Sequence, residues 1–390
     1  MEPRQLETVI VGGRALLPDG TLAETEITLR DGRIAALGVA PGAAARRWNV
    51  PGLLVLPGMI DLHGDAFERQ LMPRPGVRFP DALAMMETDR QLVANGITTA
   101  YHGLTYSWEP GLRGAESARR FLATLHELRS RLVCDARVHL RFETFNLAAE
   151  QEVIDWIADG LIDLFAFNDH TGDIAEHLDS DKLAAYAARS GLDGAAFTDL
   201  LRQVMDRAAE VPASMRRMAD AARQAGVPMA SHDDMSPEVQ AAFHALGCGL
   251  CEFPFDRATA QAALDRGART ILGAPNVVRG GSHLARLGGR EAVAENLCSV
   301  LTSDYYYPAL MAAAFTLVEL ELTDLAGAWR LVSSNPADAV NLTDRGRIAP
   351  GQRADLLLVD WQKGRLPRLV ATFVGGEAVF TADNPLRMIA

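Results

Sequence analysis

The sequence predicts an α/β protein: a TIM (β/α)8-type barrel with a small β-sandwich domain formed by both termini. Between residues 56 and 344, eight short apolar runs alternate with longer segments of helical periodicity, as in parallel strands joined by helices. Residues 1–55 and 345–390 instead alternate apolar and polar positions, interrupted by Asp-Gly, Gly-Gly and Pro-Gly turns. These turns are typical of antiparallel hairpins. We therefore expect a discontinuous β-sandwich domain at 1–55 and 345–390 around a barrel domain at 56–344.

The individual elements follow in order along the chain. The hairpins of the first segment are expected in TVIVGGRALLPDG, EITLRDGRIAALG and RRWNVPGLLVLP, and those of the last in GRIAPGQRADLLLVD and LVATFVGGEAVF. Amphipathic stretches such as DALAMMETDRQLVANG separate the barrel strands, and the longer helical region leaves room for a ninth strand. The eight predicted barrel strands are LVLPGMIDLH, GITTAYHG, ARVHLRFE, LIDLFAFND, GVPMASHDD, GLCEFPF, ARTILGAPN and SVLTSDYYY.

Composition restricts the class of partner. The net charge of −12 argues against nucleic acid, because no global basic field exists to collect phosphates. A small anionic substrate requires a local cluster of arginines. No apolar run reaches the length of a membrane span, so we expect no membrane partner. Four cysteines and no secretory signal predict a cytoplasmic protein.

Metal-binding residue types gather at the ends of the predicted barrel strands. In such a barrel the chemistry lies at the carboxyl ends of the strands and on the loops that follow. One strand-end histidine is most simply a capping or core residue, but five strand ends with His, Asp or Glu at one barrel mouth indicate a site. The residues are His63 and Asp65, Glu143, Asn168 to His170, His232 to Asp234, and Ser303 with Asp304.

Imidazole and carboxylate without thiolate suit a pair of divalent ions, Zn, Mn or Fe, rather than a structural cysteine site. His63 and Asp65 lie on one face of an extended segment and could hold one ion together. Two such ions would produce a nucleophile from water near neutral pH. A metal-free pair of carboxylates acting as acid and base is the alternative, but it leaves the histidines without a role.

The order HGD, RFE, NDH, SHDD and TSD inside a two-ended β-sandwich resembles the amidohydrolase superfamily. Members of that superfamily often bridge their metals with a carbamylated lysine. Lys182 and Lys363 are the only lysines here, and neither ends a predicted strand. The resemblance therefore implies Glu143 as the bridging carboxylate.

A narrower resemblance rests on DLHGDAFERQLMPRPGV, HLRFE, FNDHTG, ASHDD, GAPNVVRGGSH and LTSDYYYPALM, which occur in order over residues 56–310. They are similar to the PhnM-type family of phosphonate catabolism, the α-D-ribose 1-methylphosphonate 5-triphosphate diphosphatases. That family releases pyrophosphate from its substrate. The resemblance implies hydrolysis of the α–β phosphoanhydride and a small phosphorylated sugar as substrate.

Carried over by position, the resemblance implies a metal centre of six residues, in which Asp304 also orients the attacking water and receives its proton. One departure concerns the first motif: the family usually has His-Thr-Asp-Asn there, whereas this chain has Gly64 and Ala66. Both ligand types remain, so the departure bears on substrate identity rather than on the metals. The six implied ligands are His63, Asp65, Glu143, His170, His232 and Asp304.

Three further residues are predicted to bind the substrate phosphates. Arg74 lies in the proline-rich MPRPGV loop, and Arg279 and His283 lie in VVRGGSH, where two glycines let backbone N–H groups approach an anion. An amide substrate would not require these loops.

Two other functions compete with the diphosphatase. One is a carbon–nitrogen hydrolase of the same superfamily, such as a deacetylase or cyclic amidase. The other is a non-catalytic homologue retained in a phosphonate-processing complex, although the chain keeps metal-competent side chains at all six positions. The sequence does not determine the oligomeric state, but barrels of this size often pair, and a homodimer is one expectation.

Overall fold

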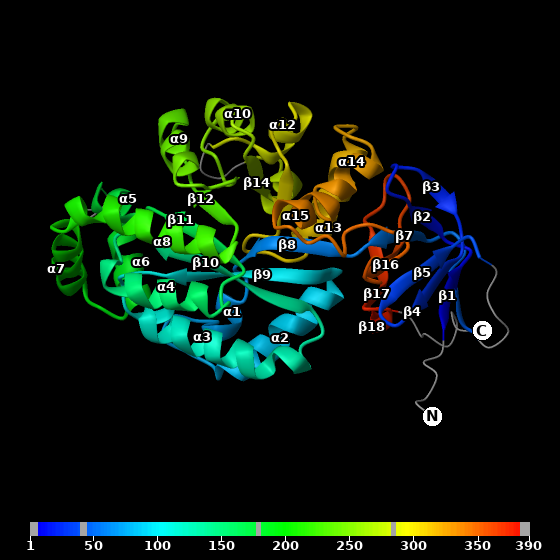
Figure 1. Ribbon diagram of the computed structural model, residues 1–390, viewed down its shortest axis with the longest axis horizontal. Helices are drawn as coiled ribbons and strands as arrows, with labels where there is room; N and C mark the ends of the chain where they lie inside the picture. The colour runs from blue at the N-terminus through cyan, green and yellow to red at the C-terminus, as the bar shows by residue number, and fades with distance from the viewer. Residues whose placement is uncertain (1–6, 40–44, 177–180, 282–285, 383–390) are drawn as a thin grey trace.

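A computed structural model describes residues 7–39, 45–176, 181–281 and 286–382, and its strands form three sheets (Figure 1). The largest sheet has eight strands in sequential order, and each neighbouring pair is parallel. A parallel bridge between Gly64 and Asp304 brings the last strand beside the first. Each of the eight predicted runs overlaps one of these strands, so the barrel is confirmed. They are β8 (Met59–Gly64), β9 (Ile97–Tyr106), β10 (Asp135–Glu143), β11 (Leu164–Asn168), β12 (Met229–His232), β13 (Leu250–Glu252), β14 (Arg269–Gly273) and β15 (Val300–Thr302).

Helices follow the strands and surround the sheet (Figure 1). The helix Val211–Ala225 buries Met218 and Ala222 on one face and ends at Gly226, whose φ of 70° suits a residue without a side chain. The longer helices are α2 (Asp81–Ala94), α3 (Ala115–Leu128), α4 (Glu150–Ala158), α6 (Asp181–Ser190), α7 (Gly194–Met205), α8 (Val211–Ala225), α9 (Pro237–Ala245), α10 (Arg257–Asp265) and α13 (Ala309–Glu319). The shorter ones are α1 (Glu68–Leu71), α5 (Thr171–Glu176), α11 (Ala274–Arg279), α12 (Gly289–Ala294), α14 (Leu325–Arg330) and α15 (Ser334–Ala339).

Both ends of the chain build the remaining two sheets. β7 pairs antiparallel with β16, so strands from the two termini lie side by side in one six-stranded sheet (Figure 1). Trp48 and Phe373 pack edge to face in the core of this part, with ring centroids 5.0 Å apart. The six-stranded sheet has β18 (Glu377–Thr381), β17 (Arg368–Val374), β16 (Leu356–Asp360), β7 (Leu54–Pro57), β2 (Arg14–Leu16) and β3 (Leu22–Glu24); the four-stranded sheet has β5 (Arg33–Leu37), β4 (Ile27–Arg30), β1 (Thr8–Val11) and β6 (Arg46–Asn49).

Arg345 connects the segment that precedes β16 to the barrel. Its Nη1 donates to Asp135 Oδ2 at 2.5 Å and to Thr99 Oγ1 at 2.9 Å, near the amino ends of β10 and β9. The Arg345 side chain is 7% exposed. Within the described residues, none of the helices has both the length and the apolar composition needed to cross a bilayer.

Candidate metal centre and its cavity

The carboxyl ends of β8 and β15 bring three of the predicted ligands together. One ligand atom each from His63, Asp65 and Asp304 lies within 4.8 Å of the others, and we call these residues the Asp304 group. The buried Asp61 carboxylate holds the two strand ends side by side, since it accepts from Ser303 N at 2.9 Å and from Thr302 Oγ1 at 2.5 Å.

A second set, the His170 group, consists of His170, His232 and Asp233, whose ligand atoms also lie within 4.8 Å of one another. His170 follows β11, His232 is the last residue of β12, and Asp233 follows it. Glu143, at the end of β10, contacts this group: its Oε1 is 2.6 Å from His170 Nδ1. Arg141 lies between the two groups, with Nη1 3.3 Å from Asp65 Oδ2 and Nη2 3.1 Å from His232 Nε2. All six predicted ligands therefore meet at the barrel mouth.

The electrostatics of the metal-free protein differ between the groups. Burial and the positive charge of Arg141 lower the pKa of both His63 and His232 to about 3, so these rings are neutral and can offer a lone pair to a metal. Burial and the charge of Asp65 raise the pKa of Asp304 to about 7. Burial alone would lower the pKa of His170, but the Glu143 and Asp233 carboxylates raise it to about 9.

The backbone is constrained where these residues sit. Asp233, Phe253 and Asp304 all have positive φ, between 52° and 57°, a conformation that costs a non-glycine residue of order 1–3 kcal/mol. Gly64 is required for a different reason. A Cβ there would lie 2.8 Å from Asp61 Oδ2, so the glycine allows Asp61 to approach β15 closely. This approach is a physical reason for a glycine in the HGDA motif.

A cavity of about 580 Å³ opens in front of both groups. Four arginines line it, together with the carboxylates Asp233 and Asp304. All four arginines also pair with carboxylates: Arg113 with Glu68, Arg141 with Asp65 and Arg189 with Glu109, which lie outside the lining, and Arg286 with Asp233, which is part of it. The lining residues that carry charge or a ring nitrogen are His63, Arg113, Arg141, Arg189, His232, Asp233, Arg286 and Asp304.

The residues predicted to bind phosphate lie elsewhere. Arg74 is exposed in the loop between α1 and α2 and does not line this cavity. Arg279 is exposed at the end of α11, where Nη1 is 3.4 Å from Tyr305 Oη; Tyr305 lines the cavity, so Arg279 stands at its rim. His283 lies outside the described residues.

Sequence reasoning passed over several residues that the fold brings to the site. Glu252 ends β13 and would have been found by reading that strand end like the others. Arg113 follows β9 on a short 3-10 turn and Arg189 lies near the end of α6, positions that no strand-end pattern marks. Arg286 lies after α11 and pairs with Asp233.

The donor sets fit divalent ions. Each group combines imidazole with carboxylate and contains no thiolate, which suits Zn, Mn or Fe. His63, Asp65 and Asp304 would hold one ion, and His170, His232 and Asp233 another.

The chain is similar in sequence to a characterised enzyme and in fold to solved structures. The chain is 29% identical over 357 residues to the α-D-ribose 1-methylphosphonate 5-triphosphate diphosphatase of Escherichia coli strain K12, which covers 90% of this chain and 94% of that one. The crystal structure of an amidohydrolase superposes with a TM-score of 0.65 at 16% identity, covering 97% of this chain and 99% of the other. The chain therefore has the fold of an amidohydrolase and is similar in sequence to a diphosphatase.

A second relative has a different activity. The chain is 27% identical over 398 residues to the adenine deaminase of Brucella suis biovar 1, covering 97% of this chain but 58% of the deaminase. No family model matches the chain. These two relatives thus differ in activity: one is a diphosphatase and the other a deaminase.

Proposed function

We propose that this protein belongs to the amidohydrolase superfamily, and that it hydrolyses the α–β phosphoanhydride of α-D-ribose 1-methylphosphonate 5-triphosphate and releases pyrophosphate. The observation that carries the proposal is the arginine-lined wall of the cavity beside both metal-binding groups. The similarity to the Escherichia coli diphosphatase over most of both chains supports the same substrate class.

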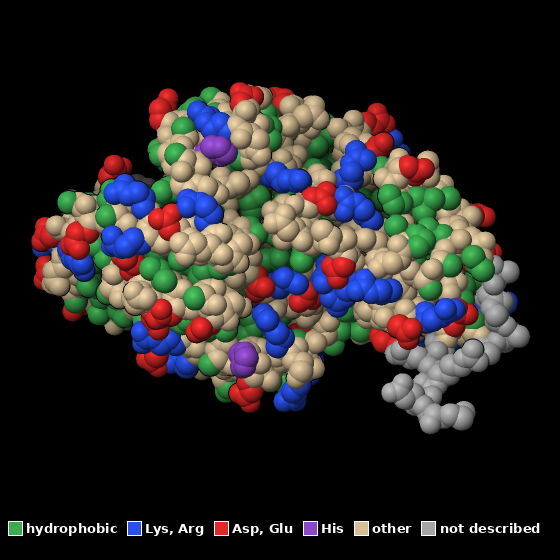
Figure 2. Space-filling model, viewed as in Figure 1, with side chains coloured by type: hydrophobic (Ala, Val, Ile, Leu, Met, Phe, Trp, Pro, Cys, Tyr) green, Lys and Arg blue, Asp and Glu red, His purple; other side chains and the backbone are tan. Residues whose placement is uncertain are grey.

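The cavity arginines provide a local anion site in an acidic protein. The chain has a net charge of −12, and Lys and Arg side chains are intermingled with Asp and Glu over the face drawn in Figure 2. Arg113 uses Nε and Nη2 for Glu68, at 2.9 Å each. A guanidinium has five N–H donors, so Arg113 retains donors on Nη1 for a phosphate oxygen. Charge-assisted contacts of this kind stabilise the negative charge that develops on departing pyrophosphate.

The residues in and between the two groups would have different roles in the reaction. Divalent ions held there would supply an activated water and polarise a phosphoryl oxygen. Asp304, a carboxylate at the centre of this site, would take the proton of the attacking water. Arg141 lies between the groups and can neutralise charge on the phosphoryl group during transfer.

The similarity to adenine deaminase favours a second candidate, hydrolysis of a carbon–nitrogen bond. The same metal-activated water serves both reactions, so the metal ligands do not separate them. The arginines do, because a neutral purine or amide offers no charge to pair with them.

Purified protein loaded with Zn²⁺, Mn²⁺ or Fe²⁺ should release pyrophosphate from 5-triphosphorylated ribose compounds. Adenine, N-acyl amino acids and nucleoside triphosphates serve as competing substrates in parallel assays. Pyrophosphate release from the ribose compounds supports the proposal. Turnover of adenine or an N-acyl amino acid without pyrophosphate release would refute it.

Two variants locate the phosphate site. The double variant Arg189→Gln with Glu109→Gln removes a cavity arginine without leaving its buried carboxylate partner unpaired. We expect it to raise KM for the triphosphate by 10-fold or more, about 1.4 kcal/mol. Arg74→Gln, an exposed position outside the cavity, is the matched control and should leave KM unchanged. If instead Arg74→Gln raised KM and the double variant left it unchanged, the MPRPGV loop would be the phosphate site.

A further inference from the structure

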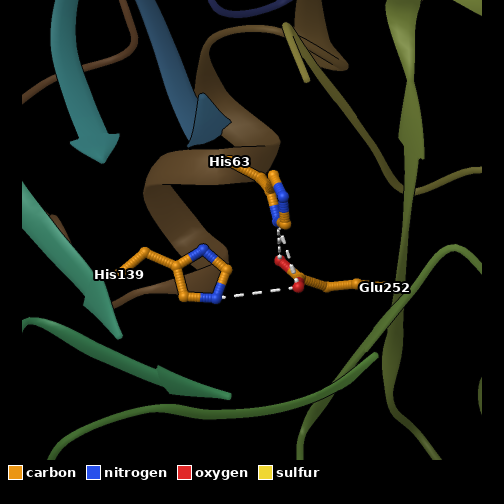
Figure 3. A group of neighbouring side chains, drawn as sticks. All are labelled: His63, His139 and Glu252. Atoms are coloured by element: carbon orange, nitrogen blue, oxygen red, sulfur yellow. Dashed lines mark hydrogen bonds and ion pairs between the residues drawn. The ribbon is translucent and has the colours of Figure 1, made fainter. Parts of the chain in front are cut away.

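Glu252 is a fully buried carboxylate at the end of β13, in contact with a histidine from each of the two metal-binding groups. Three imidazoles surround it. Its oxygens lie 3.2 Å from His63 Nδ1, 3.1 Å from His232 Nδ1 and 3.6 Å from His139 Nε2 (Figure 3 shows His63 and His139 around Glu252). A buried carboxylate in such surroundings needs hydrogen-bond donors, and the ring nitrogens are the groups at hand.

The tautomer of His232 follows from its two neighbours. Arg141 Nη2 lies 3.1 Å from His232 Nε2, and a guanidinium donates but cannot accept. His232 Nε2 must therefore carry the lone pair, and Nδ1 carries the proton that Glu252 accepts. This arrangement places the lone pair on Nε2, where a metal would replace the Arg141 N–H as its partner.

His63 has the same arrangement. Its Nδ1 lies 3.2 Å from both oxygens of Glu252, and a carboxylate only accepts, so Nδ1 carries the proton and Nε2 the lone pair. The rings of His63 and His232 are stacked, with centroids 5.4 Å apart and planes 15° from parallel. One carboxylate thus orients two parallel imidazoles, one from each metal-binding group.

His139 does not compete for this role. Its Nδ1 lies 2.9 Å from the Leu62 carbonyl oxygen, which can only accept, so Nε2 of the neutral ring carries a lone pair. In the part of the chain that the structure describes, this buried Nε2 has no hydrogen-bond partner. His139 packs edge to face on His63, with centroids 5.0 Å apart, and supports its ring position.

We propose that Glu252 is a positioning residue that sets the tautomer and orientation of His63 and His232 together, and so couples the two halves of the metal centre. The proposal rests on the metal centre and not on the identity of the substrate. A carboxylate that accepts the second N–H of a ligating histidine fixes the ring and increases its basicity, and removing such a partner weakens metal affinity 10–100-fold in other proteins. Because one carboxylate serves both rings, a single substitution should weaken both sites.

A cation held by His63, His139 and Glu252 is the competing assignment, because their ligand atoms also lie within 4.8 Å of one another. It requires His63 to offer Nδ1 to this ion. The proton would then sit on Nε2, and His63 could no longer serve the Asp304 group. The two assignments therefore predict different metal stoichiometries.

Full-length Glu252→Gln and Glu252→Ala proteins test the proposal, with Asp234→Asn as the control. Asp234 is a buried carboxylate two residues after His232, and it accepts from Ser231 Oγ at 2.7 Å rather than from a candidate ligand. Co²⁺ binding is measured by chelator competition, by metal content at saturation, and by the visible absorption of the bound ion. Unfolding by urea, without metal, reports stability separately.

We expect both Glu252 variants to bind Co²⁺ 10–100-fold more weakly at both sites, with full stoichiometry at saturation and shifted absorption bands. The control should retain wild-type affinity and spectrum. Co²⁺ affinities of the Glu252 variants within twofold of wild type would overturn the proposal. Loss of one ion at saturation, with the affinity of the remaining sites unchanged, would also overturn it. None of these measurements uses substrate, so absence of pyrophosphate release in wild-type protein would refute the proposed function alone.

Discussion

Proton release should control the metal affinity of the His170 group. In the metal-free protein, burial opposes protonation of His170, but Glu143 at 2.6 Å from Nδ1 and Asp233 at 3.5 Å from Nε2 raise its pKa to about 9. At neutral pH the ring is therefore an imidazolium, which has no lone pair for a metal. Each ion that binds this ring must displace one proton.

The size of the effect follows from this pKa. Affinity at the His170 group should rise about tenfold per pH unit, or about 100-fold between pH 7 and 9, and level off above that. The Asp304 group behaves differently. The pKa of His63 is lowered to about 3 by burial and Arg141, and that of Asp304 is raised to about 7 by burial and Asp65. Its affinity should already level off near pH 7.

The measurement is Zn²⁺ competition against a chelator of known pH dependence, from pH 6 to 9.5, resolved into two binding steps. NMR of the metal-free protein should show one histidine with a pKa near 9. Glu143→Gln removes the nearest carboxylate charge and should bring this pKa back toward the ordinary value. Two steps that are both independent of pH between 7 and 9 would refute the reasoning.

Three further predictions concern stability. Arg345→Met should lower the free energy of unfolding in urea by about 2–4 kcal/mol. This value is toward the lower part of the range for buried ion pairs, because Asp135 still pairs with Arg137 in the variant. A double-mutant cycle with Asp135→Asn that shows no coupling would contradict this. Burial alone would raise the pKa of Asp135, but the charges of Arg137 and Arg345 outweigh burial and lower it. The stabilisation by the Asp135 carboxylate is therefore present above about pH 4 and is lost as the pH falls through the folded-state pKa. Wild type should therefore lose more stability than Arg345→Met on acidification below pH 4, and equal losses would count against the pair. Asp61→Ala leaves the buried N–H and O–H donors of Ser303 unpaired, at a cost of about 1–3 kcal/mol each. A thermal scan should show a lower Tm, and metal analysis should show a reduced metal content. Unchanged metal content would show that Asp61 does not hold the site together.

Local patterns in the sequence were enough to predict the barrel and the residues at its mouth. A buried parallel strand is a short apolar run, and the point where it becomes polar marks its carboxyl end. Parallel strands in a closed sheet bring those ends together, so His63 and Asp304 meet although more than 200 residues separate them. The same rule, applied to β13, leads to Glu252.

Only the tertiary structure decided which charged side chains face the cavity. Arg74 and Arg279 occur beside glycine and proline, as expected of anion-binding loops, yet both are exposed. Arg113 and Arg189 reach the cavity because long-range ion pairs with Glu68 and Glu109 hold them there. The hydrogen-bonding pattern of the sheet positions the strand ends, and each strand end can be recognised from the local sequence. The direction of a loop side chain depends instead on partners far along the chain, which local sequence does not reveal.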